Sequence, residues 1–157
     1  MPRRPVDLDL ELEKCGNEAV AAAVRLAIQK LFDHDIYLLK RNVHERTVSA
    51  ALAFHMRGLF EGLNVDPEFN KIGDDAKSIQ EGEVRRGIIP DIIVHRRGEP
   101  FGDNLLAIEI KCAKRGRTDR DIRKLEGMRR DLGYSYALFV RFDVGQQAGN
   151  VTELRWI

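Results

Sequence analysis

Hydrophobic positions along the chain follow two spacings, which divide it into expected helices and strands. Apolar residues at every third or fourth position predict helices, whereas alternating or short continuous apolar runs predict strands. The expected helices span residues 17–32, 43–61 and 118–132, and the expected strands span 63–71, 88–95, 105–111, 134–142 and 151–157. Pro67 confines the first strand to a sheet edge or a bulge, because proline lacks an N–H to donate.

Polar and glycine-containing segments indicate where these elements stop. The Asp33-His34-Asp35 run is expected to end the first helix. Thr118 is expected to cap the last helix, with Asp121 in the capping-box position and Gly133 as the stop. Residues 73–87 hold three glycines and several acids, and this composition predicts a long surface loop.

The resulting order of elements predicts one α/β domain over residues 1–157. Two helices are followed by three strands, a helix, a strand and a possible last strand, which favours an α/β sandwich around a mixed sheet. Residues 1–40 form an N-terminal helical extension with one extra helix, and residues 43–142 form the core. The alanine-rich first helix suits either core packing or a homodimer surface, and the sequence leaves both open.

Composition excludes several classes of protein. Hydrophobic residues make up 43% of the 157 positions, which is enough for a core and argues against disorder. Only two cysteines are present, Cys15 and Cys112, so a disulfide scaffold is excluded. No apolar run is long enough to cross a bilayer, and the N-terminus lacks a signal peptide's apolar stretch. We therefore expect a soluble cytoplasmic protein without a membrane partner.

Two expected strands carry acidic residues at positions where the pattern predicts burial. Asp91 shares a strand face with Ile89 and Ile93, and Glu109 and Lys111 share a face that begins with apolar residues. A buried carboxylate is costly unless it is paired or binds a metal. If the strands are neighbours, the two carboxylates and the lysine meet and suit Mg²⁺ and phosphodiester hydrolysis. An internal salt bridge at a strand end is the alternative.

The residues Pro90-Asp91, followed after 17 intervening residues by Glu109-Ile110-Lys111, resemble the PD-(D/E)XK nuclease superfamily, which has the restriction-endonuclease-like fold. Its αβββαβ core order matches the order expected here from about residue 43 to 142. The resemblance implies metal ligation by Asp91, Glu109 and the Ile110 carbonyl, with Lys111 activating the nucleophile or stabilising charge. It implies Mg²⁺ as cofactor, which Mn²⁺ can replace. The chain lacks the glutamine and tyrosine pair of RecB-like exonucleases after Lys111.

Glu45 is the candidate for the extra acidic residue that this superfamily often adds from its first core helix. It lies three residues before Val48 and therefore on the apolar face of the helix, where it would point to the sheet and act as a catalytic metal ligand. Asn42 and Glu45 also fit a capping box, in which Glu45 would bond back to the Asn42 amide. Both interpretations remain open on sequence grounds.

A basic segment follows Lys111 directly. Residues 111–130 contain nine basic and three acidic residues, a local net charge of +6, whereas residues 61–83 have a local net charge of −5. The formal net charge of +1 is therefore a cancellation and does not exclude a polyanionic partner. Phosphate contact is predicted for Lys114, Arg115, Arg117, Arg120, Arg123 and Lys124, with Arg85 and Arg86 as weaker candidates. A solvated helix face is the alternative.

These observations predict a Mg²⁺-dependent nuclease, with DNA favoured as the nucleic acid it binds. The rival hypothesis is a catalytically inactive module of the same fold that binds nucleic acid or assembles with a partner. A purely structural subunit is a third hypothesis, without a positive feature in the sequence to support it.

Overall fold

The computed structural model describes residues 3–72, 75–99, 102–113 and 115–157. Its centre is a five-stranded sheet in the order β1-β6-β7-β8-β9, in which β7 and β8 run parallel and the other neighbours run antiparallel. The sheet strands are β1 (Asn64–Pro67), β6 (Ile92–His95), β7 (Leu106–Cys112), β8 (Tyr136–Phe142) and β9 (Val151–Trp156). The fold is therefore mixed α/β, as the sequence predicts.

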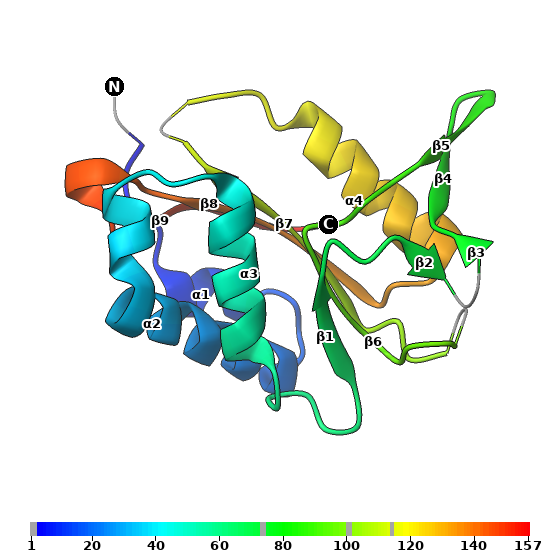
Figure 1. Ribbon diagram of the computed structural model, residues 1–157, viewed down its shortest axis with the longest axis horizontal. Helices are drawn as coiled ribbons and strands as arrows, with labels where there is room; N and C mark the ends of the chain where they lie inside the picture. Colours follow the sequence, from blue (N-terminus) through cyan, green and yellow to red (C-terminus); the bar gives the residue numbers. More distant parts are fainter. Residues whose placement is uncertain (1–2, 73–74, 100–101, 114) are drawn as a thin grey trace.

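Helices cover both faces of this sheet (Figure 1). On one face lie α1 (Leu8–Glu13), α2 (Glu18–Lys40) and α3 (Glu45–Met56), which share the larger hydrophobic core with the sheet. On the other face lies α4 (Asp119–Leu132), which shares a smaller core with Ile93, Ala107 and Phe139. Because successive strand residues alternate between the two cores, β7 is apolar on both faces, as expected of an interior strand.

Several boundaries expected from the sequence are confirmed. Glycine at position 133 takes a left-handed conformation with φ 70° and ends α4, and β9 is present as the last strand. β1 lies at the sheet edge, where Pro67 needs no ladder partner for its nitrogen. β1 and β6 are shorter than expected, since residues on either side of them leave the ladder.

The N-terminal helices differ from the prediction. α2 continues to Lys40 instead of ending at Asp33-His34-Asp35, because Leu39 is fully buried and His55 lies 2.6 Å from the Asp35 carboxylate. Only the backbone of Asp35 departs from helical angles, which makes a kink instead of an end. α1 was not expected, so the region before residue 40 holds two helices instead of one.

α3 ends at Met56, five residues before the predicted end, because the backbone of Arg57 is extended and Gly58 has a φ of 81°. The Thr118 side chain makes no capping hydrogen bond to α4, and Asp121 instead pairs with Lys111. The predicted capping box is therefore wrong, and Asp121 contacts Lys111 on β7 instead.

The segment expected to be a long surface loop contains strands. β2 (Lys71–Ile72) pairs with β3 (Asp75–Ala76), and β4 (Ser78–Glu81) pairs with β5 (Val84–Gly87) in a hairpin. A two-residue turn joins β4 and β5, and Gly82 there has the positive φ that tight hairpin turns require. The remaining short helix is η1 (Gly145–Gln147). Within the described residues, no helix is both long and apolar enough to span a membrane.

Candidate active site

The register of the sheet brings Asp91 and Glu109 together. β6 and β7 are neighbours, and Ile92 pairs with Ile108 at the end of their ladder. One step further along each strand, Asp91 lies opposite Glu109, and its backbone N–H donates to Glu109 Oε1 at 3.3 Å. Asp91 also accepts, at its Oδ2, the backbone N–H of Ile110 at 2.7 Å. Asp91 and Glu109, which are separated by 17 intervening residues in the sequence, are thus adjacent in space.

Burial determines the acidity of this carboxylate pair. Desolvation raises the pKa of Asp91, although the Ile110 N–H and the charge of Lys124 oppose it. Glu109 is only 3% exposed, and desolvation together with the charge of Asp91 raises its pKa well above the usual value. The charge of Asp91 therefore destabilises the ionised form of Glu109, and a cation close to both carboxylates would relieve that repulsion.

Two lysines reach this pair or its surroundings. Lys124 Nζ lies 2.7 Å from Glu109 Oε1, so one of the basic residues predicted to contact phosphate lies directly beside the carboxylate pair. Lys111 Nζ lies 3.3 Å from Asp121 Oδ2, and both side chains are partly exposed. Because positions 121 and 124 are three apart on α4, the helix presents a carboxylate and an amine to the site from the same face.

Glu45 enters the site from the start of α3. Its Oε2 accepts the backbone N–H of Cys112 at 2.8 Å, just beyond Lys111 on β7. The capping-box alternative is wrong, because the residue that caps α3 is His44, whose Nδ1 accepts the Arg46 N–H at 3.3 Å. Cys112 itself is buried in the larger core, and burial raises the pKa of its thiol to about 12.

One pocket of about 760 Å³ contains the acidic and basic residues together. Its lining includes Glu45, Asp91, Glu109, Lys111, Arg117, Arg120, Asp121, Arg123 and Lys124. Arg115 is exposed beside it but is not part of the lining, and Lys114 lies outside the described residues. A further pocket of about 450 Å³ shares Glu45 and Asp91 with it, so the open space continues past the carboxylates.

The donor set fits a hard divalent cation, although the side chains do not form a finished metal cage. Carboxylate and carbonyl oxygens are the ligands that Mg²⁺ prefers. The observed hydrogen bonds and ion pair use one oxygen of each of Asp91, Glu109 and Glu45. In the described ranges, no group of three or more His, Cys, Asp or Glu side chains is arranged to hold a metal ion. Two carboxylates with raised pKa are the observation that supports the fit.

The backbone around Asp91 is fixed from both sides. The Glu68 N–H donates to the Asp91 carbonyl oxygen at 3.1 Å, and Glu68 has a φ of 50°, which is uncommon for a residue other than glycine. The Glu68 carboxylate pairs with Arg46 Nε at 3.0 Å. Asp91 is therefore held by contacts to β7 on one side and to the end of β1 on the other.

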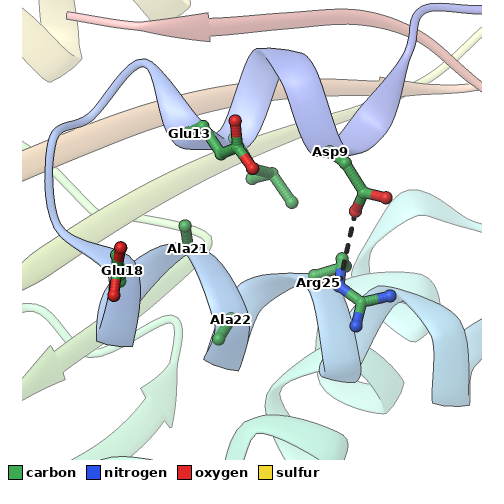
Figure 2. A pocket seen from close by; sticks show the side chains of 7 residues that line it. Asp9, Glu13, Glu18, Ala21, Ala22 and Arg25 are labelled. Carbon is green, nitrogen blue, oxygen red and sulfur yellow. Dashed lines mark ion pairs between the residues drawn. The ribbon is translucent and has the colours of Figure 1, made fainter.

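A smaller pocket of about 190 Å³ lies between α1 and α2, away from these residues (Figure 2). The Asp9–Arg25 ion pair, at 3.3 Å, lies at one end, and Glu13 and Glu18 lie toward the other. Ala21 and Ala22 form part of its wall. None of the residues that the sequence predicts to be functional lines it, so we assign the chemistry to the larger pocket.

Among the charged residues that line the larger pocket, the sequence did not identify Glu81 and Asp121 as part of a site, and it gave Arg86 only as a weaker candidate for phosphate contact. For Asp121, its position three residues before Lys124 on a helix was an available signal. Glu81 and Arg86 depend on the docking of the β4–β5 hairpin, which no local pattern indicates. Comparisons with protein-family models, with curated proteins and with solved structures find no match.

Proposed function

We propose that this protein is a Mg²⁺-dependent nuclease of the restriction-endonuclease-like fold that hydrolyses phosphodiester bonds of DNA. The observation that carries the proposal is the Asp91–Glu109 pair, which lies at the end of the β6–β7 ladder in a pocket that basic residues also line. The element order α3, β1, β6, β7, α4, β8 supports the αβββαβ fold.

Each residue has a role that follows from its position. Asp91, Glu109, Glu45 and the Ile110 carbonyl would hold the cation. When bound, Mg²⁺ supplies an activated water and neutralises charge on the phosphate. Lys111 would orient the attacking water and stabilise the negative charge that grows on the phosphate oxygens. Asp121 holds the Lys111 ammonium in place through the 3.3 Å ion pair.

Lys124 supplies a positive charge beside the carboxylate pair. Its ammonium lies 2.7 Å from Glu109 and offsets the repulsion between the carboxylates. When a cation binds, we expect Lys124 to move away from Glu109 toward the phosphate. Arg117, Arg120 and Arg123 line the same pocket and would hold neighbouring phosphates.

The substrate panel tests this proposal. Plasmid, linear duplex and single-stranded DNA, and RNA, are incubated with the protein, with and without Mg²⁺, beside Lys111→Ala and Asp91→Asn. We expect DNA cleavage that requires Mg²⁺ and is lost in both variants. A matched control is Lys14→Ala, which removes an exposed lysine outside the pocket and should leave the rate unchanged. Cleavage that persists in both site variants contradicts the proposal.

The Lys124–Glu109 ion pair also favours a second candidate function, a nucleic-acid-binding module that uses a lysine where an enzyme uses a metal. Calorimetric titration separates the two candidates. Binding of Mg²⁺ or Mn²⁺ that is weakened in Glu109→Gln supports the nuclease. Salt-sensitive DNA binding with no heat of metal binding supports the module.

A further inference from the structure

The β4–β5 hairpin is anchored firmly to α4 at one end. Ile79 is fully buried against Gly127, where a β-carbon would lie 2.6 Å from the Ile79 side chain. The Gln80 N–H donates to Asp131 Oδ2 at 2.8 Å, and Arg130 donates to the Gln80 carbonyl at 2.7 Å. The Arg130 hydrogen bond lowers the pKa of Asp131 to about 2, so that anchor stays ionised. The base of the hairpin is therefore fixed relative to the pocket.

The rest of the hairpin is exposed and carries two arginines and two glutamates, with both arginines on β5. Every residue of β5 is exposed, including Arg85 and Arg86, and the hairpin points away from the sheet (Figure 1). Arg86 pairs with Glu81 at 2.9 Å, but both side chains are accessible to solvent. Such surface pairs contribute little stability, so Arg86 can exchange this partner for a phosphate at small cost.

The end of the hairpin lines the same pocket as the region where α4 starts. Arg86, Gly87 and Ile89 contribute to its lining, as do Arg117, Arg120 and Arg123 and the carboxylates of Asp91 and Glu109. Two apolar side chains, Val84 and Ile89, are more than half exposed on the same arm. Exposed apolar side chains beside arginines suit contact with bases and backbone together.

The dimensions of a two-stranded β-ribbon determine which kind of nucleic-acid duplex can accept it in a groove. The major groove of B-DNA admits a two-stranded β-ribbon, whereas the major groove of duplex RNA is too narrow for side chains to enter. Building on the proposed function, we propose that the β4–β5 hairpin is an arm that binds double-stranded DNA in its major groove, with Arg85 and Arg86 on the phosphate backbone. The arm holds the duplex so that one strand reaches Asp91 and Glu109.

Equilibrium binding tests the arm separately from cleavage. Anisotropy of labelled duplex DNA, single-stranded DNA and duplex RNA of one sequence is measured without divalent cations, at several salt concentrations. We expect Arg85→Ala/Arg86→Ala to bind duplex DNA about tenfold more weakly. The slope of log K against log salt should fall by about 1.8, because two phosphate contacts are lost. Single-stranded DNA should be affected less, and duplex RNA should bind more weakly than duplex DNA to the unchanged protein.

Two further variants make the result decisive. Lys14→Ala/Arg25→Ala removes the same charge from the α1–α2 surface and should leave the affinity for duplex DNA within about twofold. Arg86→Lys keeps the charge and should keep the salt slope. The proposed role of the arm is contradicted if the arm and control variants lose affinity equally. It is also contradicted if the unchanged protein binds all three nucleic acids with equal affinity. If the arm fails while Mg²⁺-dependent cleavage persists, the proposed function stands.

Discussion

Arg141 is fully buried on β8 and fixes the segment that leads from β7 to α4. Its guanidinium donates to the carbonyl oxygens of Ala113 and Gly116, both at 3.1 Å, and to Glu153 at 3.2 Å. Because these donors hold the backbone just after Lys111, Arg141 connects the stability of the sheet to the position of the basic segment.

We expect Arg141→Met to lower the free energy of unfolding by about 3 kcal/mol, because the hydrogen bonds of a fully buried guanidinium to two carbonyls and to Glu153 are lost, although Glu153 keeps its pair with Arg3. Arg3 pairs with the same Glu153 at 2.7 Å but is exposed, so Arg3→Ala should cost less than about 1 kcal/mol. Urea unfolding of both variants measures the difference. Equal losses of unfolding free energy in the two variants would mean that the buried hydrogen bonds of Arg141 add nothing to stability beyond a surface ion pair.

Lys77 is a buried lysine that the sequence analysis did not single out. It is 2% exposed, and its Nζ lies 2.9 Å from the Tyr134 hydroxyl. Desolvation lowers the pKa of its ammonium to about 8, although the charge of Asp66 opposes this shift. Between pH 8 and the usual lysine pKa, the unfolded chain binds more protons than the folded protein, so this group makes stability rise with pH.

Comparison with Lys77→Met isolates this effect, because the variant cannot titrate there. Relative to the variant, the wild-type protein should gain stability from pH 8 to pH 10, with a slope that approaches ~1.4 kcal/mol per pH unit. The Cys112 thiol, with its raised pKa, contributes in the opposite direction above pH 9 but is common to both proteins. Urea midpoints that shift in parallel across this range would refute the assignment.

At the scale of elements, the sequence correctly predicted those helices and strands that a periodic pattern of apolar residues determines. Apolar residues repeat every three to four positions in α4 and fill or alternate along β7 and β8. The predicted bounds of these elements lie within about two residues of the observed ones. The prediction that α2 ends at Asp33-His34-Asp35 was wrong, because Asp35 pairs with His55 on another helix and the sequence does not reveal that contact. The β4–β5 hairpin was missed because its only buried apolar side chain, Ile79, packs on α4.

The same distinction applies to the candidate site. Asp91, Glu109 and Lys111 could be predicted because carboxylates interrupt apolar strands, and Lys124 because it follows on the next helix. Glu81 and Arg86 reach the pocket only through tertiary docking of the hairpin, which local periodicity does not encode. Glu45 remained ambiguous until its contact with the Cys112 N–H was visible.

The contact between Ile79 and Gly127 predicts that Gly127→Ala destabilises the protein when the Ile79 side chain is present and stabilises it when that side chain is removed. Gly127→Ala should destabilise the protein by about 1 kcal/mol, because crowding against Ile79 outweighs the higher helix propensity of alanine. In an Ile79→Gly background no side-chain atom of residue 79 remains to crowd the new methyl group, and Gly127→Ala should then stabilise α4. Thermal unfolding of the four proteins measures this cycle, and additive effects would contradict the contact.

At the scale of the whole molecule, charge is segregated around one pocket. The near-neutral total charge conceals a basic segment around the start of α4, which lines one pocket together with Arg86 of the hairpin and with the carboxylate pair at the end of the β6–β7 ladder. The sheet fixes the carboxylates through its register, while the basic residues come from elements outside it. In the proposed function, this arrangement attracts a polyanion and brings it to the acidic centre, where a divalent cation would offset the repulsion.

The initial rate of plasmid cleavage as a function of Mg²⁺ concentration tests this account most directly, in the wild-type protein and in Lys111→Ala. We predict a rate that saturates with Mg²⁺ in the wild type, falls to background with a chelator, and drops at least about a hundredfold in the variant, as expected for the loss of a group that stabilises transition-state charge. A rate that is independent of Mg²⁺, or equal in the two proteins, would contradict the central claim.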